Sequence, residues 1–267
     1  MVQRIALGLE YHGGPFQGWQ KQDPPAATIQ QHLEIALSRV ADQPIATVCA
    51  GRTDAGVHAT QQVLHFDTTA LRAERDWVGG CNANLPPTIR ALWAKAVPDD
   101  FDARRKALAR RYRYVIHNQP IRSALGHALW SSHYRPLCAW RMHQAAQLWL
   151  GEHDFSSFRA SECQSHSPVR TLHEITVSRV EGWVFVELQA NAFLHHMVRN
   201  MVGVLLCIGE KKQELNWAAT VLQARCRKQA AVTAPADGLY LVAVYYPPHY
   251  DVPSSKSVPW FLGRFDK

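Results

Sequence analysis

The sequence predicts a mixed α+β fold built from two halves. Some stretches alternate apolar and polar residues with a period of two, as strands do, while others repeat apolar residues at helical spacing. Strand, helix and strand follow one another in both halves, and 267 residues suffice for one large domain or two small ones. We therefore expect one α/β domain over residues 1–103 and a second over residues 104–267.

The first half contains the clearest helix start. Thr28 stands where an N-cap is expected and Gln31 follows three residues later, the spacing of a capping box. Apolar residues then recur on one face of a helix that reaches about residue 40. A second helix is expected within residues 70–83, and strands are expected at residues 5–11, 45–50, 61–68 and 89–98.

The second half predicts the same mixture. A hairpin is expected over residues 170–191, with its turn at Glu181 and Gly182. A strongly apolar helix is expected to begin near Met197 and to stop at Gly209. The remaining elements are strands at 112–116 and 238–246 and helices at 142–150 and 214–226.

Charge and composition indicate the class of partner and the compartment. Lys and Arg number 29 against 22 Asp and Glu, a net charge of +7 (29 − 22), which favours a polyanion such as nucleic acid, although a modest basic excess also aids solubility. The six cysteines include no C-x-x-C pair, as expected in a reducing compartment. No signal-peptide pattern and no apolar run of about 18 residues is present. We expect a cytoplasmic protein that does not enter a membrane.

The stretch AGRTDAGVHA, residues 50–59, places charged groups in a tight connection between two expected strands. Arg52 and Asp54 are two residues apart, so in an extended segment both side chains leave the same face. Gly51 and Gly56 allow tight turns and close approach of a ligand. These features allow a carboxylate and a guanidinium to point into one space, but the spacing alone favours an Asp that bonds its own turn, with Arg52 as a surface neighbour.

Arg199 and Tyr112 are the two candidates from the second half. Arg199 lies beside the apolar stripe of its helix, so it either pairs with a carboxylate such as Asp54, keeping that group ionised, or extends to solvent. Tyr112 lies in RRYRY, where tyrosines face one side of a strand and arginines the other. Such interleaving suits stacking on an unpaired base, although core tyrosines with solvated arginines are more usual.

Several common chemistries have no support in the sequence. We find no phosphate-binding G-x-x-x-x-G-K-[ST] loop, no G-x-S-x-G elbow and no G-x-G-x-x-G after a strand, so no cofactor is expected. The adjacent His195 and His196 lack the i, i+4 spacing of a zinc helix, and no metal is expected.

Five blocks together resemble the pseudouridine synthases, and within them the tRNA pseudouridine synthase A family. The resemblance covers the chain from its first strand to about Tyr250. The blocks are GRTDAGVHA (51–59), ARRYRYVI (109–116), DFSSFRA (154–160), ANAFLHHMVRNMVG (190–203) and GLYLVAVYY (238–246).

The resemblance implies a fold, a reaction and partners. It implies two α/β subdomains whose mainly antiparallel sheets join into one extended central sheet, with the active-site cleft between them. It implies a homodimeric isomerase that converts uridine to pseudouridine at positions 38, 39 and 40 of the tRNA anticodon arm, without a cofactor.

The resemblance also implies roles for five residues. Asp54 would be the nucleophile and Arg199 its partner, Arg52 would help displace the target nucleotide, Tyr112 would stack on the flipped uracil, and Leu241 would form an apolar wall. The rival interpretations are an RNA-binding protein without catalysis and a nuclease that uses Asp54 as a general base.

Overall fold

The computed structural model describes residues 2–23 and 26–253, so the last residues of the predicted second domain lie outside the described part. The described chain divides into two compact units. One contains the described residues up to 109 together with those from 240 onward, and the other contains residues 110–239. The mixed α+β class is confirmed, because each unit combines helices with a mainly antiparallel sheet.

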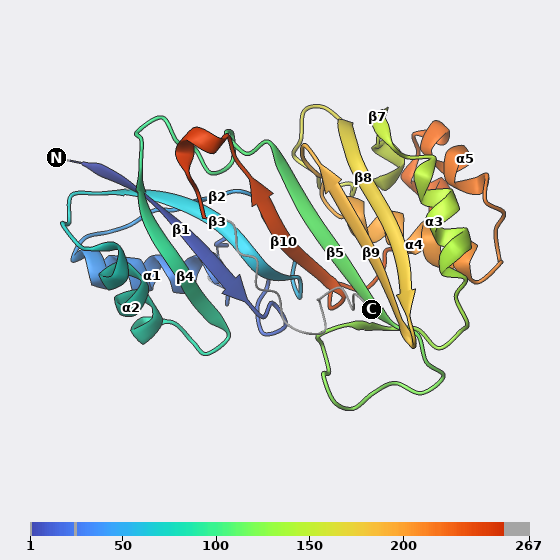
Figure 1. The fold of residues 1–267 in the computed structure, drawn as a ribbon, viewed down its shortest axis with the longest axis horizontal. Helices are drawn as coiled ribbons and strands as arrows, with labels where there is room; N and C mark the ends of the chain where they lie inside the picture. The colour runs from blue at the N-terminus through green and yellow to red at the C-terminus, as the bar shows by residue number, and fades with distance from the viewer. Residues whose placement is uncertain (1, 24–25, 254–267) are drawn as a thin grey trace. The chain divides into compact units, whose positions relative to one another are not determined.

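The first unit is built on strands β4 (Ile89–Val97), β1 (Gln3–Tyr11), β3 (His58–Thr68) and β10 (Leu239–Tyr245), in that spatial order. The first two neighbour pairs are antiparallel, whereas β10 runs parallel to β3 beside it (Figure 1). The short β2 (Val48–Cys49) also pairs with β3. The last strand, β10, thus belongs to the same unit as the first strand, β1. The sequence pattern does not indicate this.

Two helices cover this sheet. In α1 (Ile29–Ala41) the predicted N-cap is present, since the Thr28 hydroxyl accepts a hydrogen bond from the Gln31 backbone amide at 3.4 Å. The helix buries the apolar stripe that its spacing predicts, including Ile29 and Leu33. It packs on α2 (Glu74–Asn84), which in turn lies against β4. Trp77 of α2 is fully buried in this layer.

The second unit has strands β5 (Ala109–His117), β9 (Trp183–Ala190), β8 (Val169–Val180) and β7 (Gly151–Asp154), ordered β5-β9-β8-β7 and all antiparallel. The predicted hairpin is β8 and β9, and Glu181 at its turn has φ of 51°. A two-residue strand, β6 (Ser131–Ser132), pairs with β5. Neither β6 nor β7 was predicted, because neither alternates apolar and polar residues over enough positions.

Three helices pack on this second sheet. Helix α3 (Ala139–Gln147) lies along β8, and α4 (Met197–Gly209) and α5 (Trp217–Ala224) pack on α3 (Figure 1). Helix α4 ends at Gly209 as predicted and is buried over most of its length, so it forms the centre of this unit's core. Within the described residues, none of the helices combines the length and hydropathy that crossing a bilayer requires.

Candidate functional site

The loop that carries Asp54 connects β2 to β3 in the first unit. The Val57 amide donates to the Asp54 carbonyl oxygen at 3.1 Å, which closes a turn. Gly56 inside this turn has φ of 80°, a conformation that side chains other than glycine adopt at a cost. The glycine predicted to allow a tight connection is therefore used for that purpose.

Alternation along this loop separates Thr53 from its two charged neighbours. Thr53 is buried, and its hydroxyl makes a buried hydrogen bond of 2.9 Å with the hydroxyl of Tyr11. Arg52 is exposed and Asp54 is half-buried. Thr53 thus anchors the loop to the sheet. Its side chain leaves the opposite face from Arg52 and Asp54, as expected for an extended segment.

Backbone contacts fix the loop from the segment that follows β1. The Trp19 amide donates to the Thr53 carbonyl oxygen at 3.0 Å. Gly18 has φ of 85°, and a Cβ added there would lie 2.8 Å from that same oxygen and 3.1 Å from the Asp54 carbonyl carbon. Trp19 and Phe16, which the sequence places in a loop, are buried. They anchor the segment that supports the Asp54 backbone.

Leu241 lies on β10 next to the strand that leaves the Asp54 loop. Tyr240 and Leu241 are the register partners of His58 and Ala59, the first residues of β3. The Tyr240 ring stacks on the His58 ring, with centroids 4.6 Å apart and an interplanar angle of 21°. Leu241 is fully buried. The first unit therefore brings the Leu241 strand to the base of the loop that carries Asp54.

His58 and Tyr240 are residues that the sequence reasoning did not single out. The Nδ1 atom of His58 accepts a buried hydrogen bond of 3.0 Å from the Gly13 amide, which assigns its proton to the other ring nitrogen while that bond is made. The two residues are 182 positions apart (240 − 58), so no local pattern could reveal their stack. The only available signal was that both lie inside motif blocks.

Tyr112 lies on β5 in the second unit and is 8% exposed. Its ring meets that of Phe193 edge to face, with centroids 5.0 Å apart. Arg110 on the same strand donates from Nη1 to the Asn191 carbonyl oxygen at 2.8 Å. These two contacts attach the 191–196 segment, which leads into α4, to the strand that carries Tyr112.

The arginines that alternate with the tyrosines face carboxylates. Arg111 contacts Glu187 at 2.9 Å and Glu174 at 3.3 Å, and Arg113 forms an ion pair with the same Glu187. The two arginines share a face as predicted. Glu187 is buried and neutralises much of their charge, so protein carboxylates hold these two arginines.

Arg199 lies in the first turns of α4 and is half-buried. Its Nε donates to the Ala234 carbonyl oxygen at 2.8 Å, and the Ala234 amide donates to the Arg199 carbonyl oxygen at 3.1 Å. The guanidinium is thus held by the segment before β10. Arg52, Asp54 and Leu241 belong to the first unit, and Tyr112 and Arg199 to the second.

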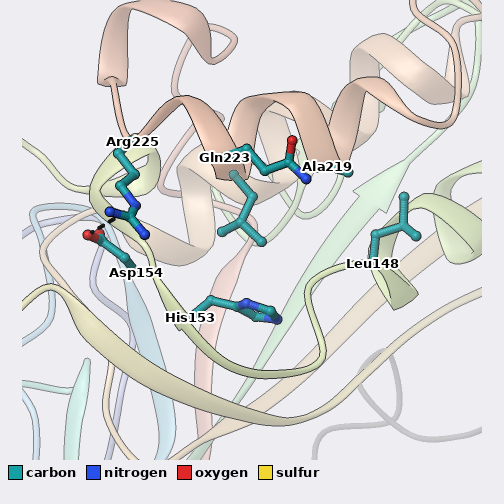
Figure 2. Close-up of a pocket in the computed structure, with 7 residues that line it drawn as sticks. Leu148, His153, Asp154, Ala219, Gln223 and Arg225 are labelled. Atoms are coloured by element: carbon teal, nitrogen blue, oxygen red, sulfur yellow. Dashed lines mark ion pairs between the residues drawn. The ribbon is translucent and has the colours of Figure 1, made fainter.

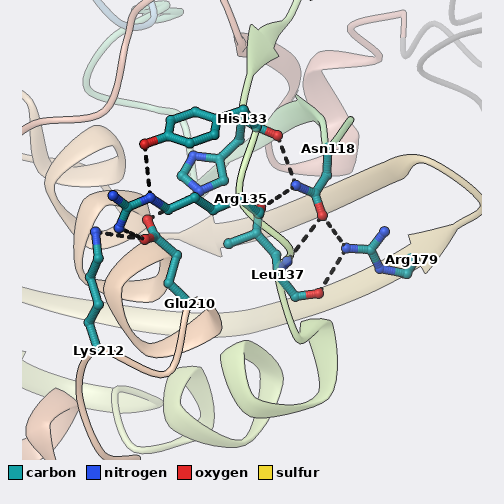
Figure 3. A network of polar contacts seen from close by, with 8 residues as sticks. Asn118, His133, Arg135, Leu137, Arg179, Glu210 and Lys212 are labelled. Atoms are coloured by element: carbon teal, nitrogen blue, oxygen red, sulfur yellow. Dashed lines mark hydrogen bonds and ion pairs between the residues drawn. The ribbon is translucent and has the colours of Figure 1, made fainter. Parts of the chain in front are cut away.

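Two further features of the second unit contain none of the predicted residues. Glu210, at the end of α4, is surrounded by His133, Arg135 and Lys212 (Figure 3). The side chains of Lys212 and Arg135 lower the pKa of Glu210 although burial opposes them.

A shallow pocket of about 210 Å³ lies under α5 (Figure 2), and it is lined by Leu148, His153, Asp154, Ala219, Leu222, Gln223 and Arg225.

Comparison with known proteins identifies the family. The profile of a family described as tRNA pseudouridine synthase matches residues 9–104 and 145–247, most of the chain and parts of both units. The chain belongs to this family. Family members are isomerases, so the enzyme class expected from the sequence is confirmed.

Individual relatives are similar over nearly the full length. A tRNA pseudouridine synthase A of Coxiella burnetii (strain Dugway 5J108-111) is 52% identical over 261 residues, which cover 98% of this chain and 100% of the relative. The protein of the same name from Escherichia coli O9:H4 (strain HS) is 54% identical over 261 residues, with 98% and 96% covered. The profile of the tRNA pseudouridine synthase family includes Asp54, Arg199 and Leu241, while Tyr112 lies between its two matched ranges.

Proposed function

We propose that this chain isomerises uridine to pseudouridine at positions 38, 39 and 40 of the tRNA anticodon stem-loop, with Asp54 as the nucleophile. The observation that carries the proposal is the Asp54 loop. The Asp54 carboxylate is half-buried, and contacts of Thr53 and Trp19 and the turn at Gly56 fix the backbone that carries it. The chain belongs to the tRNA pseudouridine synthase family. A reactive group on a fixed backbone is what positional catalysis requires.

The reaction breaks the N1–C1′ bond and forms a C5–C1′ bond. The carboxylate of Asp54 attacks the ring or the sugar, or removes the proton at C2′, and every one of these routes needs it ionised. Arg199 would supply the positive charge that favours the ionised form. No redox step or group donor is required, so ordinary side chains suffice and no cofactor is proposed.

A base inside a stem must first be extruded, at a cost of a few kcal/mol. Arg52 would fill the space left in the stem, which suits its exposed position. Tyr112 would stack on the extruded uracil, contributing about 1–3 kcal/mol. Leu241 would form an apolar wall of the pocket.

We further propose that the protein is a cytoplasmic homodimer and that its basic surface binds the tRNA anticodon arm.

Replacing Asp54 by Asn tests the proposal, because the amide keeps the shape and loses the nucleophile. Pseudouridine formation on unmodified tRNA should become undetectable while tRNA binding stays nearly unchanged. Asp42→Asn is the matched control, since Asp42 is exposed in the same unit and its φ of 53° suits Asn. Full activity of the Asp54 variant would overturn its assignment.

The two rival functions give different results in the same assay. An RNA-binding protein without catalysis leaves uridine unchanged in the wild-type reaction. A nuclease shortens the tRNA, usually with a metal. Full-length tRNA containing pseudouridine after incubation in EDTA excludes both.

A further inference from the structure

Two arginines of the second unit lie at the ends of the segment 159–170, a loop that runs into the start of β8. The Nη2 atom of Arg159 donates to the carbonyl oxygens of Cys163 at 2.7 Å and Ser165 at 2.8 Å. Arg170 donates from Nη2 to the hydroxyl oxygen of the same Ser165 at 2.6 Å. Both guanidiniums therefore converge on Ser165, and we refer to Arg159 and Arg170 as the arginine pair.

The arginine pair lacks a carboxylate partner within residues 2–23 and 26–253. Among the described residues, no carboxylate lies within ion-pair distance of either guanidinium, whereas Arg111, Arg113 and Arg135 all have one. Burial and the adjacent positive charge of Arg159 lower the pKa of Arg170. The Nε of Arg170 is buried and finds no acceptor in the part of the chain that the structure describes. Two close cations without a counter-charge attract an anion.

The thiol of Cys163 gives independent evidence that this loop stabilises negative charge. Its Sγ atom receives a hydrogen bond of 3.5 Å from the His195 amide. Burial disfavours the thiolate, but the amides of His195 and Ser165 and the charge of Arg159 outweigh it and lower the pKa of Cys163. The loop thus stabilises negative charge on the Cys163 sulfur, although burial opposes it.

The loop is attached to the segment that packs on Tyr112. The Ala160 amide donates to the His195 carbonyl oxygen at 3.0 Å. The Asn191 amide donates to the Thr171 carbonyl oxygen at 3.2 Å, just beyond the loop. The 191–196 segment carries Phe193, which meets the Tyr112 ring. The arginine pair and Tyr112 therefore flank the same short segment of the second unit.

We propose that the arginine pair binds a backbone phosphate of the tRNA, close to the nucleotide that stacks on Tyr112. The Nη1 atom of Arg170 already donates to the carbonyl oxygens of Ser167 and Val169, so the pair attracts a phosphate chiefly through its positive charge. The pair fixes the loop through carbonyl oxygens and so keeps its positive charge for the ligand. This inference rests on the proposed function, which supplies the RNA, and adds a binding site for its backbone.

The first experiment measures tRNA binding against salt concentration for Arg170→Gln. Losing one phosphate contact should raise the Kd about tenfold and reduce the slope of log K against log salt by about one. Arg170→Lys should keep the slope, because it keeps the charge. Arg225→Gln is the matched control: this arginine is 70% exposed, pairs with Asp154 at 3.6 Å (Figure 2), and should leave the slope unchanged.

The second experiment uses the wild-type protein and so does not depend on how a variant folds. Bound tRNA should slow alkylation of Cys163 by iodoacetamide, followed residue by residue by mass spectrometry, while Cys226 serves as the internal control. Protection by tRNA but not by equal inorganic phosphate supports the proposal. Protection by inorganic phosphate alone, or none by either, overturns it.

The two proposals fail in different ways. If the wild-type protein makes pseudouridine but Arg170→Gln binds tRNA with an unchanged Kd and slope, only the phosphate site is refuted. If the wild-type protein makes no pseudouridine, the proposed function is refuted.

Discussion

Replacing Thr53 by Val should loosen the Asp54 loop without creating a cavity, because the two side chains have nearly the same volume. The change removes the buried hydrogen bond of 2.9 Å between the Thr53 and Tyr11 hydroxyls. Loss of one partner of a buried hydroxyl costs about 1–2 kcal/mol. For a chain of this size, each kcal/mol lowers the unfolding midpoint by about 2–4 °C, so we expect a fall of about 2–8 °C.

The assay is thermal unfolding followed by circular dichroism, together with pseudouridine formation on unmodified tRNA. Thr53 directly precedes Asp54, so kcat should fall more than KM rises. Thr220→Val is the matched control, because Thr220 is exposed and its hydroxyl donates locally, to the carbonyl oxygen of Asn216, the N-cap of α5, at 3.2 Å. A Thr53 variant that unfolds at the same temperature as this control would refute the reasoning.

Substitutions at three further positions test the structure. Gly18→Ala should destabilise by more than about 1 kcal/mol and reduce activity, since its φ is 85° and the new Cβ would press on the Thr53 carbonyl oxygen; unchanged unfolding would contradict this. Asp67→Asn should cost less than about 1 kcal/mol, since Asp67 is 48% exposed. Arg4 lowers the pKa of Asp67, so this stabilisation is present above about pH 4 and is lost as pH falls through the lowered pKa; equal losses at pH 7 and pH 2 would refute the pair. Tyr112→Leu should lose more activity than Tyr112→Phe, which keeps the ring; equal losses would argue against stacking.

Elements with strong local signals were predictable from the sequence. Helix α1 follows from the Thr28 cap and its apolar stripe, and α4 follows from its apolar spacing and Gly209. The strand expected over residues 45–50 is only the two-residue β2, because the Ile45 and Thr47 amides donate to side chains of α1 instead of to a neighbouring strand. Strand β7, with the sequence GEHD, has no alternation to reveal it.

The chemistry of the site was predictable only in part. Local spacing indicated the Asp54 loop and the alternation around Thr53, since both depend on neighbouring residues. It could not indicate that Glu187 binds Arg111 and Arg113, because Glu187 lies more than seventy positions along the chain from either arginine. Pairings between distant strands depend on the whole fold and leave no trace in a short window of sequence.

The place of β10 in the first unit has a consequence for synthesis on the ribosome. Residues 110–239, which number 130 (239 − 109), emerge before Tyr240 can pair with His58. At about 5–20 residues per second this takes roughly 7–26 s. During that interval the start of β3 lacks its β10 neighbour, which leaves an open strand edge on which chaperones act and at which newly made chains can aggregate.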